Sequence, residues 1–223
     1  MLAPETIRAN FAQVEARVRA ACQRAGRDRS DVTLVAVTKT FPAEAVTAAV
    51  AAGASDVGEN KVQEARDKKA LAHGQSRWHL IGHLQSNKAK DAVHIFDVIQ
   101  TIDTVSLAEK VAKAAAAAGK RQEILLEVNI GREPQKAGAE PADIEALAAR
   151  VSRIDALSLT GLMMIPPAGD EKSTRAYFGQ LRKMRDELGL QHLSMGMTDD
   201  FESAIEEGAT IIRVGRAIFG SRG

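Results

Sequence analysis

The stretch Leu34-Val35-Ala36-Val37-Thr38-Lys39 decides how the rest of the chain is interpreted. Its first five residues are aliphatic, small or β-branched and suit a buried strand, and the sixth is a lysine. Pro42 suits the start of a helix, so Lys39 lies where a strand ends and a crossover connection begins. In α/β proteins ligands bind at this edge of the sheet, where a lysine amine can act as a nucleophile. The alternative is a lysine whose charged end simply extends into water.

Strand-like runs alternate with helical patterns along the chain. An amphipathic stripe that includes Cys22 predicts a helix over residues 5–25, before the first strand. The strand-like runs are residues 33–38, 55–58, 78–81, 98–102, 124–130, 158–163, 192–194 and 210–214. About eight strands alternating with helices predict an α/β fold of the (β/α)8 TIM-like barrel type with an extra N-terminal helix. An open doubly wound sheet is the alternative, and the absence of a linker-like stretch predicts one domain over residues 1–223.

Composition and charge indicate an ordinary soluble globular protein. The formal net charge of +1 gives no reason to expect binding to nucleic acid or to a membrane. The single cysteine fits a reducing compartment, and no secretory signal or membrane-spanning run is recognisable. We therefore expect a cytoplasmic protein.

A corner for phosphate is predicted at the ends of the last two strands. Barrels often bind phosphate in these loops, where Ser194, Thr198, Gly215 and Arg216 supply hydroxyls, backbone N–H groups and a cation. The alternative is plain turn and capping chemistry, with Thr198 as the N-cap of the next helix. The acids at positions 199 and 200 favour this alternative, unless they face away from the corner.

Other patterns indicate structure rather than chemistry. The histidines show no ligand spacing with acids or cysteine, so we predict no metal site. His79 lies within a strand and is expected to be a core or barrel-lining residue, whereas His83 lies at a strand end and can reach the site. Residues 61–69 predict a solvated helix face, and no Gly-x-Gly-x-x-Gly fingerprint is present.

A lysine amine and a phosphate corner on one barrel leave two chemical interpretations. One is a Schiff-base aldolase acting on a phosphorylated sugar, and the other is pyridoxal 5'-phosphate (PLP) held as an imine on Lys39. Arg213 favours the second, because an arginine at the end of the last strand can donate to a pyridine nitrogen, where an Asp or Arg is the usual partner.

At these residues the sequence resembles the pyridoxal phosphate homeostasis proteins, which are single-domain relatives of the alanine racemase barrel. The resemblance lies in residues 35–40, 58–60, 78–88, 161–163, 193–200 and 214–220, in order along nearly the whole chain. It implies an alanine racemase N-terminal-domain type barrel with PLP on Lys39, Arg213 at the pyridine nitrogen, and a role in vitamin B6 homeostasis and amino-acid and keto-acid balance. Lys61 and His83 depart from the residues that are frequent in the family. We predict that the cofactor is bound by Lys39, Asn60, His83, Ser194, Met197, Thr198, Arg213, Gly215 and Arg216.

A carrier with little or no catalysis is favoured over a PLP-dependent amino-acid racemase. Racemisation needs a second base opposite Lys39, and the one tyrosine, Tyr177, is expected to pack within a helix. The chain ends three residues after Gly220, so we expect no second domain that could supply this second base. Because arginine stays protonated, Arg213 leaves the ring nitrogen without a proton and makes the ring a poorer electron sink. We therefore predict no catalytic residue, a monomer, and transfer of cofactor to apo PLP-enzymes as partners.

Overall fold

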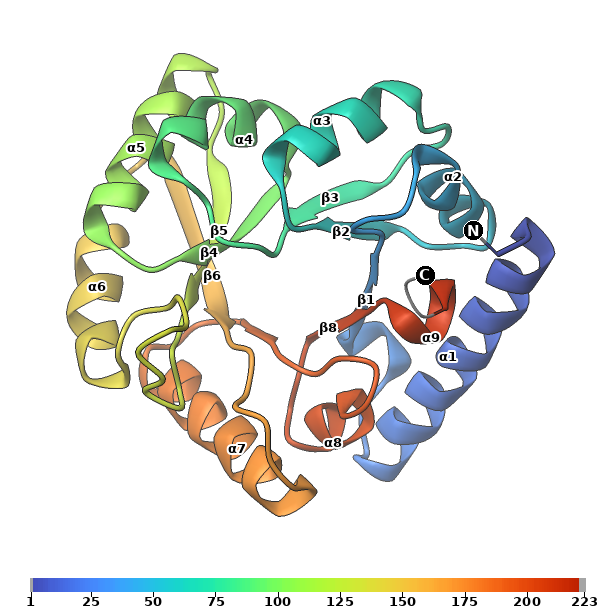
Figure 1. Cartoon of the computed structure of the whole chain (residues 1–223). Helices are drawn as coiled ribbons and strands as arrows, with labels where there is room; N and C mark the ends of the chain where they lie inside the picture. The colour runs from blue at the N-terminus through green and yellow to red at the C-terminus, as the bar shows by residue number, and fades with distance from the viewer. Residues whose placement is uncertain (1, 221–223) are drawn as a thin grey trace.

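Eight parallel strands close into a barrel in the computed structural model, which describes residues 2–220 (Figure 1). β1 pairs with β2 on one side and with β8 on the other, so the sheet has no free edge. The predicted (β/α)8 barrel is therefore confirmed and the open doubly wound sheet is excluded. The strands are β1 (Thr33–Val37), β2 (Asp56–Glu59), β3 (Arg77–Leu80), β4 (Val98–Ile102), β5 (Gln122–Glu127), β6 (Leu157–Met163), β7 (His192–Ser194) and β8 (Ile211–Val214).

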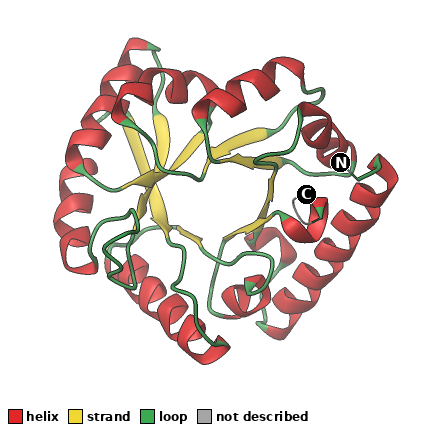
Figure 2. Cartoon of the chain, in the orientation of Figure 1, coloured by secondary structure: helices red, strands yellow, loops and turns green. Residues whose placement is uncertain are grey.

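Helices surround the strands as an outer ring (Figure 2). They cover the apolar outer face of the barrel, as parallel strands require on both sides of a sheet. The α-helices are α1 (Pro4–Arg24), α2 (Ala43–Ala51), α3 (Val62–Leu71), α4 (Ala89–Ile95), α5 (Val105–Ala117), α6 (Ile144–Val151), α7 (Glu171–Glu187), α8 (Phe201–Glu206) and α9 (Arg216–Phe219). Short 3₁₀ turns lie at Arg29–Asp31, Ser86–Lys88 and Pro141–Asp143.

α1 is the predicted extra N-terminal helix. It lies along the outside of the barrel beside α8 and α9 (Figure 1). Its apolar stripe, which includes Phe11 and Cys22, is buried in the outer core. The side-chain amide of Asn10 also donates to the backbone oxygen of Ile218 at 3.0 Å. α1 therefore supports the short C-terminal helix that follows β8.

The alternation of side chains along each strand produces an outer and an inner core. Outward residues such as Leu34 and Val57 join the large cluster beneath the helices. A small separate cluster consists of Val35, Val98, Leu125, Met163 and Ile211, which share the opposite side of their strands and fill the barrel interior. The same alternation turns polar residues inward, among them Asp56, His79, Gln100, Glu127, Ser194 and Arg213. The interior is therefore part apolar and part polar.

One strand ends earlier than predicted. Residues 124–130 are predicted as extended, whereas β5 runs over Gln122–Glu127. The side-chain oxygen of Asn129 accepts from the backbone N–H of Glu133 at 3.0 Å, and Arg132 has a positive φ of 52°. This local turn ends the strand, because an asparagine side chain competes with sheet hydrogen bonds.

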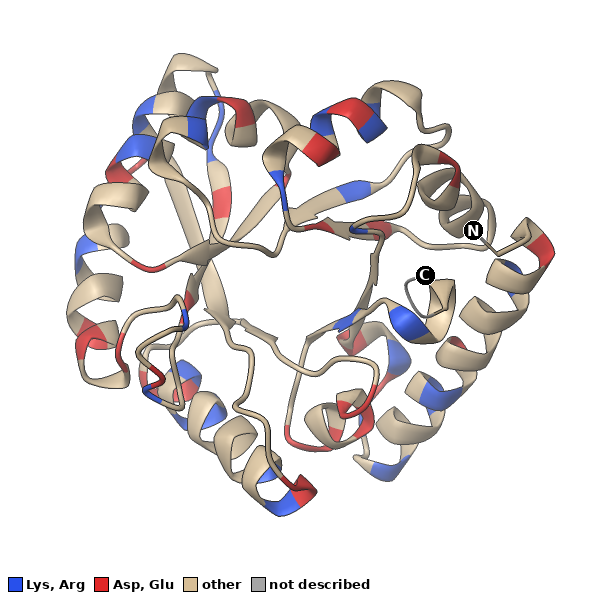
Figure 3. Cartoon of the chain, viewed as in Figure 1, with Lys and Arg blue, Asp and Glu red and all other residues tan. Residues whose placement is uncertain are grey.

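Charged residues of both signs are interspersed over the surrounding helices (Figure 3). Within residues 2–220, every helix is too short or too polar to cross a lipid bilayer.

Candidate functional site

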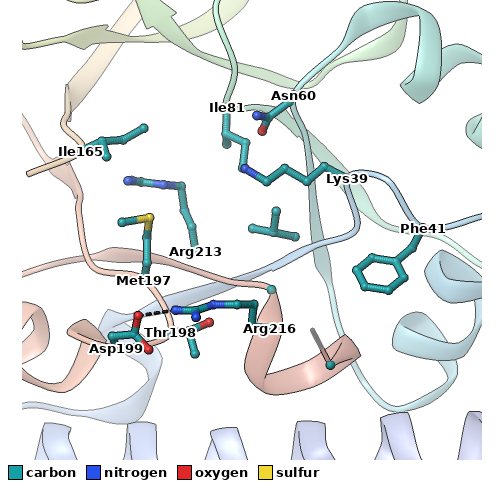
Figure 4. Close-up of a pocket in the computed structure, with 13 residues that line it drawn as sticks. Lys39, Phe41, Asn60, Ile81, Ile165, Met197, Thr198, Asp199, Arg213 and Arg216 are labelled. Carbon is teal, nitrogen blue, oxygen red and sulfur yellow. Dashed lines mark hydrogen bonds and ion pairs between the residues drawn. The ribbon is translucent and has the colours of Figure 1, made fainter. Parts of the chain in front are cut away.

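A cavity of about 200 Å³ opens at the C-terminal ends of the strands (Figure 4). This is the edge of the barrel where ligands are expected. Its lining is Val37, Lys39, Phe41, Asn60, Ile81, Ile165, Met197, Thr198, Asp199, Arg213, Gly215, Arg216 and Gly220. The cavity therefore combines an amine, two guanidinium groups, a hydroxyl and an apolar wall.

Lys39 follows the end of β1, is half-buried and extends into this cavity (Figure 4). The next residue, Thr40, has a φ of +70°, a left-handed conformation that a β-branched residue adopts only when its surroundings impose it. The backbone N–H of Phe41 donates to the oxygen of Thr38 at 3.1 Å, which closes the turn. The ring of Phe41 also lies 5.4 Å from that of Phe219, which joins this turn to α9.

A buried ionic cluster holds the turn that carries Lys39. The Nζ atom of Lys68 lies 2.7 Å from the backbone oxygen of Thr38 and from one carboxylate oxygen each of Glu59 and Glu64. The hydroxyl of Thr38 donates to Glu59 at 2.6 Å, and the N–H of Thr40 donates to Glu64. Both neighbours of Lys39 are therefore fixed by one cluster.

This cluster corrects one part of the prediction that residues 61–69 form a solvated helix face. Lys61, Arg66, Asp67 and Lys69 are exposed as predicted, whereas Lys68 is buried. Lys68 is only 6% exposed, and Glu59 is completely buried. Burial raises the pKa of Glu59, and the hydrogen bonds from Lys68 and Thr38 oppose that rise without cancelling it. The prediction failed at Lys68 because charge spacing along a helix does not show that a carboxylate ends the neighbouring strand beneath it.

Arg213 is the penultimate residue of β8, lies inside the barrel mouth and is only 4% exposed. Its two terminal nitrogens donate to the hydroxyl of Ser194 at 2.6 Å and to the backbone oxygen of Met164 at 2.8 Å. Burial lowers the pKa of Arg213 to about 10, against the opposing effect of Glu127 and Asp200. The guanidinium is therefore a fixed cation at neutral pH.

The corner formed by the ends of β7 and β8 brings Thr198, Gly215 and Arg216 to the cavity. A Cβ atom at position 215 would lie 3.3 Å from the backbone oxygen of Val37, so glycine permits a close approach there. Arg216 forms an exposed ion pair with Asp199, which also lines the cavity. The acid at position 199 thus faces the corner.

Thr198 is not the N-cap of the following helix. α8 begins at Phe201, and Asp200 precedes it. A carboxylate oxygen of Asp200 accepts from the backbone N–H of Met197 at 2.6 Å and so closes the turn itself. Burial raises the pKa of Asp200. The hydroxyl of Thr198 is left at the cavity surface.

Seven of the nine predicted cofactor residues line the cavity: Lys39, Asn60, Met197, Thr198, Arg213, Gly215 and Arg216. Ser194 is instead completely buried and bonded to Arg213, because the strand alternation turns it into the barrel interior. His83 is exposed on the loop after β3 and is not part of the lining.

Three apolar wall residues and one buried amide were not predicted from the sequence. Phe41, Ile81 and Ile165 line the cavity, but an apolar residue after a strand carries no signal of its own. Gln100 is completely buried within β4 and bonds to Ser194. Its signal was available, because an amide inside an otherwise apolar buried strand needs a partner.

Comparisons with known proteins give the family. The family described as "Alanine racemase, N-terminal domain" matches residues 9–223. A curated relative from Pseudomonas aeruginosa, the pyridoxal phosphate homeostasis protein, is 44% identical over 221 residues, which is 97% of this chain and 96% of the relative.

Two solved structures have the same fold and substantial identity. A protein from Bifidobacterium adolescentis described as unknown superimposes with a TM-score of 0.91 at 38% identity, covering 97% of this chain and 95% of the other. PipY of Synechococcus elongatus, solved with PLP bound, has a TM-score of 0.80 at 41% identity, covering 92% of this chain and 99% of the other. The chain therefore belongs to the pyridoxal phosphate homeostasis protein family, whose barrel is that of the alanine racemase N-terminal domain.

Proposed function

We propose that this chain binds PLP as an imine on Lys39 and acts as a carrier in vitamin B6 homeostasis, with little or no catalysis. The observation that carries the proposal is that Lys39 and the buried cation Arg213 extend into one cavity at the C-terminal mouth of the barrel (Figure 4). The relative PipY, which is 41% identical, was solved with PLP bound.

The residues of the cavity fit this cofactor. The side-chain oxygen of Asn60 is buried with no hydrogen-bond partner within the described chain, so a ligand can satisfy it. Gly215 leaves room beside Val37, and Thr198 and Arg216 supply a hydroxyl and a cation for a phosphate. Ile81, Ile165 and Phe41 provide an apolar wall for an aromatic ring.

Each residue has a role in binding. Lys39 would hold PLP through its Nζ atom, as an imine with the aldehyde carbon formed with loss of one water molecule. Arg213 would face the pyridine nitrogen, and Thr198, Gly215 and Arg216 would hold the phosphate. When bound, PLP supplies an aldehyde for exchange with amines and a ring that can accept electrons.

A carrier is favoured over a racemase by the surroundings of the site. Tyr177 lies on α7 and packs against the outer core, away from the cavity lining. Arg213 remains a cation at neutral pH, so the ring nitrogen gains no proton and the ring remains a weak electron sink. Both features disfavour a stabilised carbanion. Effects on amino-acid and keto-acid balance follow from the supply of cofactor to apo PLP-enzymes.

Borohydride reduction tests the imine directly. The purified protein is loaded with PLP, reduced, digested and analysed by mass spectrometry. We expect the reduced adduct on the peptide that contains Lys39, no adduct in Lys39→Met, and an unchanged adduct in Lys136→Met. Lys136 is a suitable control because its ammonium is paired with Glu133 and bonded to Pro166, outside this cavity. An adduct on Lys88 or Lys136 in the wild type would falsify the assignment, and a Schiff-base aldolase would carry no cofactor mass.

A further inference from the structure

A continuous line of buried hydrogen bonds crosses the barrel interior beneath the cavity. Arg213 donates to Ser194 at 2.6 Å, and Ser194 donates to the side-chain oxygen of Gln100 at 2.6 Å. The amide nitrogen of Gln100 lies 2.9 Å from Nδ1 of His79, whose Nε2 lies 2.8 Å from a carboxylate oxygen of Asp56. The five residues come from five strands, each is less than 10% exposed, and only Arg213 reaches the cavity.

For an uncharged His79 ring, the donors and acceptors allow one direction. Asp56 as a carboxylate only accepts, so Nε2 of His79 carries a proton, and Nδ1 of a neutral ring then accepts from the Gln100 amide. The Gln100 oxygen accepts the Ser194 proton, which leaves the Ser194 oxygen free to accept from Arg213. Reversing the Gln100 amide would place its oxygen on Nδ1 of His79 and require a charged ring. It would also turn two donors, from Gln100 and Arg213, toward Ser194.

Asp56, at the acidic end of the line, is stabilised as a carboxylate by its hydrogen bonds. Burial alone would raise the pKa of Asp56, but hydrogen bonds from His79 and Ser55 outweigh it and leave that pKa below its ordinary value. The line therefore runs from a guanidinium at the cavity to a stable carboxylate on β2. Buried polar networks that are fully satisfied restrict their members to one arrangement.

We propose that the line Arg213–Ser194–Gln100–His79–Asp56 is a positioning relay that orients the guanidinium of Arg213 toward the ring of the bound cofactor. Ser194, Gln100, His79 and Asp56 act as positioning residues, because they act through Arg213. The inference rests on the proposed function for the identity of the ligand. The donor-to-acceptor direction of the hydrogen bonds in the relay is independent of that function.

The relay has a consequence that a merely structural network lacks. If it orients Arg213 for the ring nitrogen, then breaking it weakens only ligands that have this nitrogen. The carbocyclic analogue of PLP, in which C–H replaces the ring nitrogen, keeps the aldehyde and the phosphate. General damage to the barrel would weaken both ligands alike.

The test measures the dissociation constants of PLP and of the carbocyclic analogue for wild type, Ser194→Ala, Gln100→Leu and Gln122→Leu. Gln122→Leu is the matched control: this second buried glutamine donates to the backbone oxygen of Asp97 at 2.8 Å, outside the relay. We expect Ser194→Ala to weaken PLP about tenfold, the lower end for a lost charge-assisted hydrogen bond. Gln100→Leu should weaken PLP in the same selective way, and neither variant should weaken the analogue more than the control does.

The outcomes separate the relay from the proposed function. Equal losses for both ligands, or no loss of PLP affinity, overturn the relay while PLP binding stands. A wild-type protein that binds neither ligand overturns the proposed function. Nitrogen-15 NMR of the ligand-free protein then still decides the direction of the relay. A proton on Nε2 of His79, with Nδ1 bare, supports it, and a proton on Nδ1 overturns it.

Discussion

Lys68 donates to the backbone oxygen of Thr38 at 2.7 Å, immediately before the lysine that extends into the cavity. The same ammonium contacts Glu59 and Glu64, and Glu64 accepts from the backbone N–H of Thr40 on the other side of Lys39. One buried cation on α3 thus organises the end of β1. This arrangement explains how Thr40 is kept at a positive φ.

Removal of Lys68 should destabilise the protein strongly. Lys68→Met leaves the carboxylate of Glu59 buried without its cation, and we expect a loss of about 3 kcal/mol in the free energy of unfolding. Urea denaturation measures the loss. Lys90→Met is the matched control, because Lys90 is an exposed lysine on α4 and its replacement should cost less than about 1 kcal/mol. The double variant Lys68→Met/Glu59→Gln should recover part of the stability. A loss in Lys68→Met no larger than in the control would show that the cluster does not hold the turn.

Glu127 should make the protein less stable as the pH rises from about 4.5 to about 7. Burial, with a smaller contribution from Asp103, raises its pKa from 4.5 to about 7, and Arg213 opposes this. The folded state therefore binds more protons than the unfolded state in this pH window. The free energy of unfolding falls as the pH increases through the window, and the contribution of Glu127 is constant above about pH 7. The difference corresponds to about 3 kcal/mol.

Glu127→Gln tests this pH dependence by urea denaturation from pH 4 to pH 8. The variant should lack the contribution of Glu127, so its stability relative to wild type should increase with pH and be greatest at pH 8. Glu109→Gln, which changes an exposed acid, should follow the wild-type curve. A constant difference between Glu127→Gln and wild type across the range would contradict the expected titration.

Thr198 should contribute to affinity only when the ligand carries a phosphate. Loss of one hydrogen bond to a charged group costs about 1.5–3 kcal/mol, or roughly ten- to a hundredfold in affinity. Thr198→Ala should therefore weaken PLP by that factor and leave pyridoxal unchanged, and Thr198→Ser should retain affinity because it keeps the hydroxyl. Isothermal titration calorimetry provides both constants. If wild type binds pyridoxal and PLP equally well, the phosphate corner is misplaced.

Asp199 should compete with the phosphate for Arg216. The two residues form an ion pair at the cavity, and an exposed pair of this kind contributes about 0–1 kcal/mol. Asp199→Asn should therefore tighten PLP up to about fivefold, with no effect on pyridoxal. Asp67→Asn, at an exposed position of α3, serves as the control. Weaker binding of PLP to Asp199→Asn would mean that the carboxylate supports the site rather than competing in it.

A carrier should exchange the Cα proton of an amino acid little faster than free PLP does. The PLP-loaded protein is incubated with L-alanine in deuterated water, and the Cα–H signal is followed by NMR. Release of cofactor to an apo-enzyme should be measurable in the same preparation. Rapid exchange with formation of D-alanine would contradict the carrier and support a racemase instead. Tyr177→Phe and a substitution of His83 would then locate the second base.

The sequence by itself determined the barrel and most of the cavity. The alternation of strand-like and helical runs predicts eight parallel strands, and the closure of such a sheet brings the C-terminal ends of all strands to one mouth. Lys39, Asn60, Thr198, Arg213 and Gly215 each lie just at or after such an end, so their meeting follows from topology.

Only the tertiary structure decided which polar residues face inward and which partners they find. Ser194 lies on the inner side of β7 and bonds to Gln100, 94 residues earlier in the sequence, because barrel closure brings β4 and β7 within reach of each other. Lys68 is buried because α3 packs its charged side over the end of β2, where Glu59 lies. Helical charge spacing is the same for a solvated and a buried lysine. The difference lies in the neighbour across the interface, which no local pattern of residues encodes.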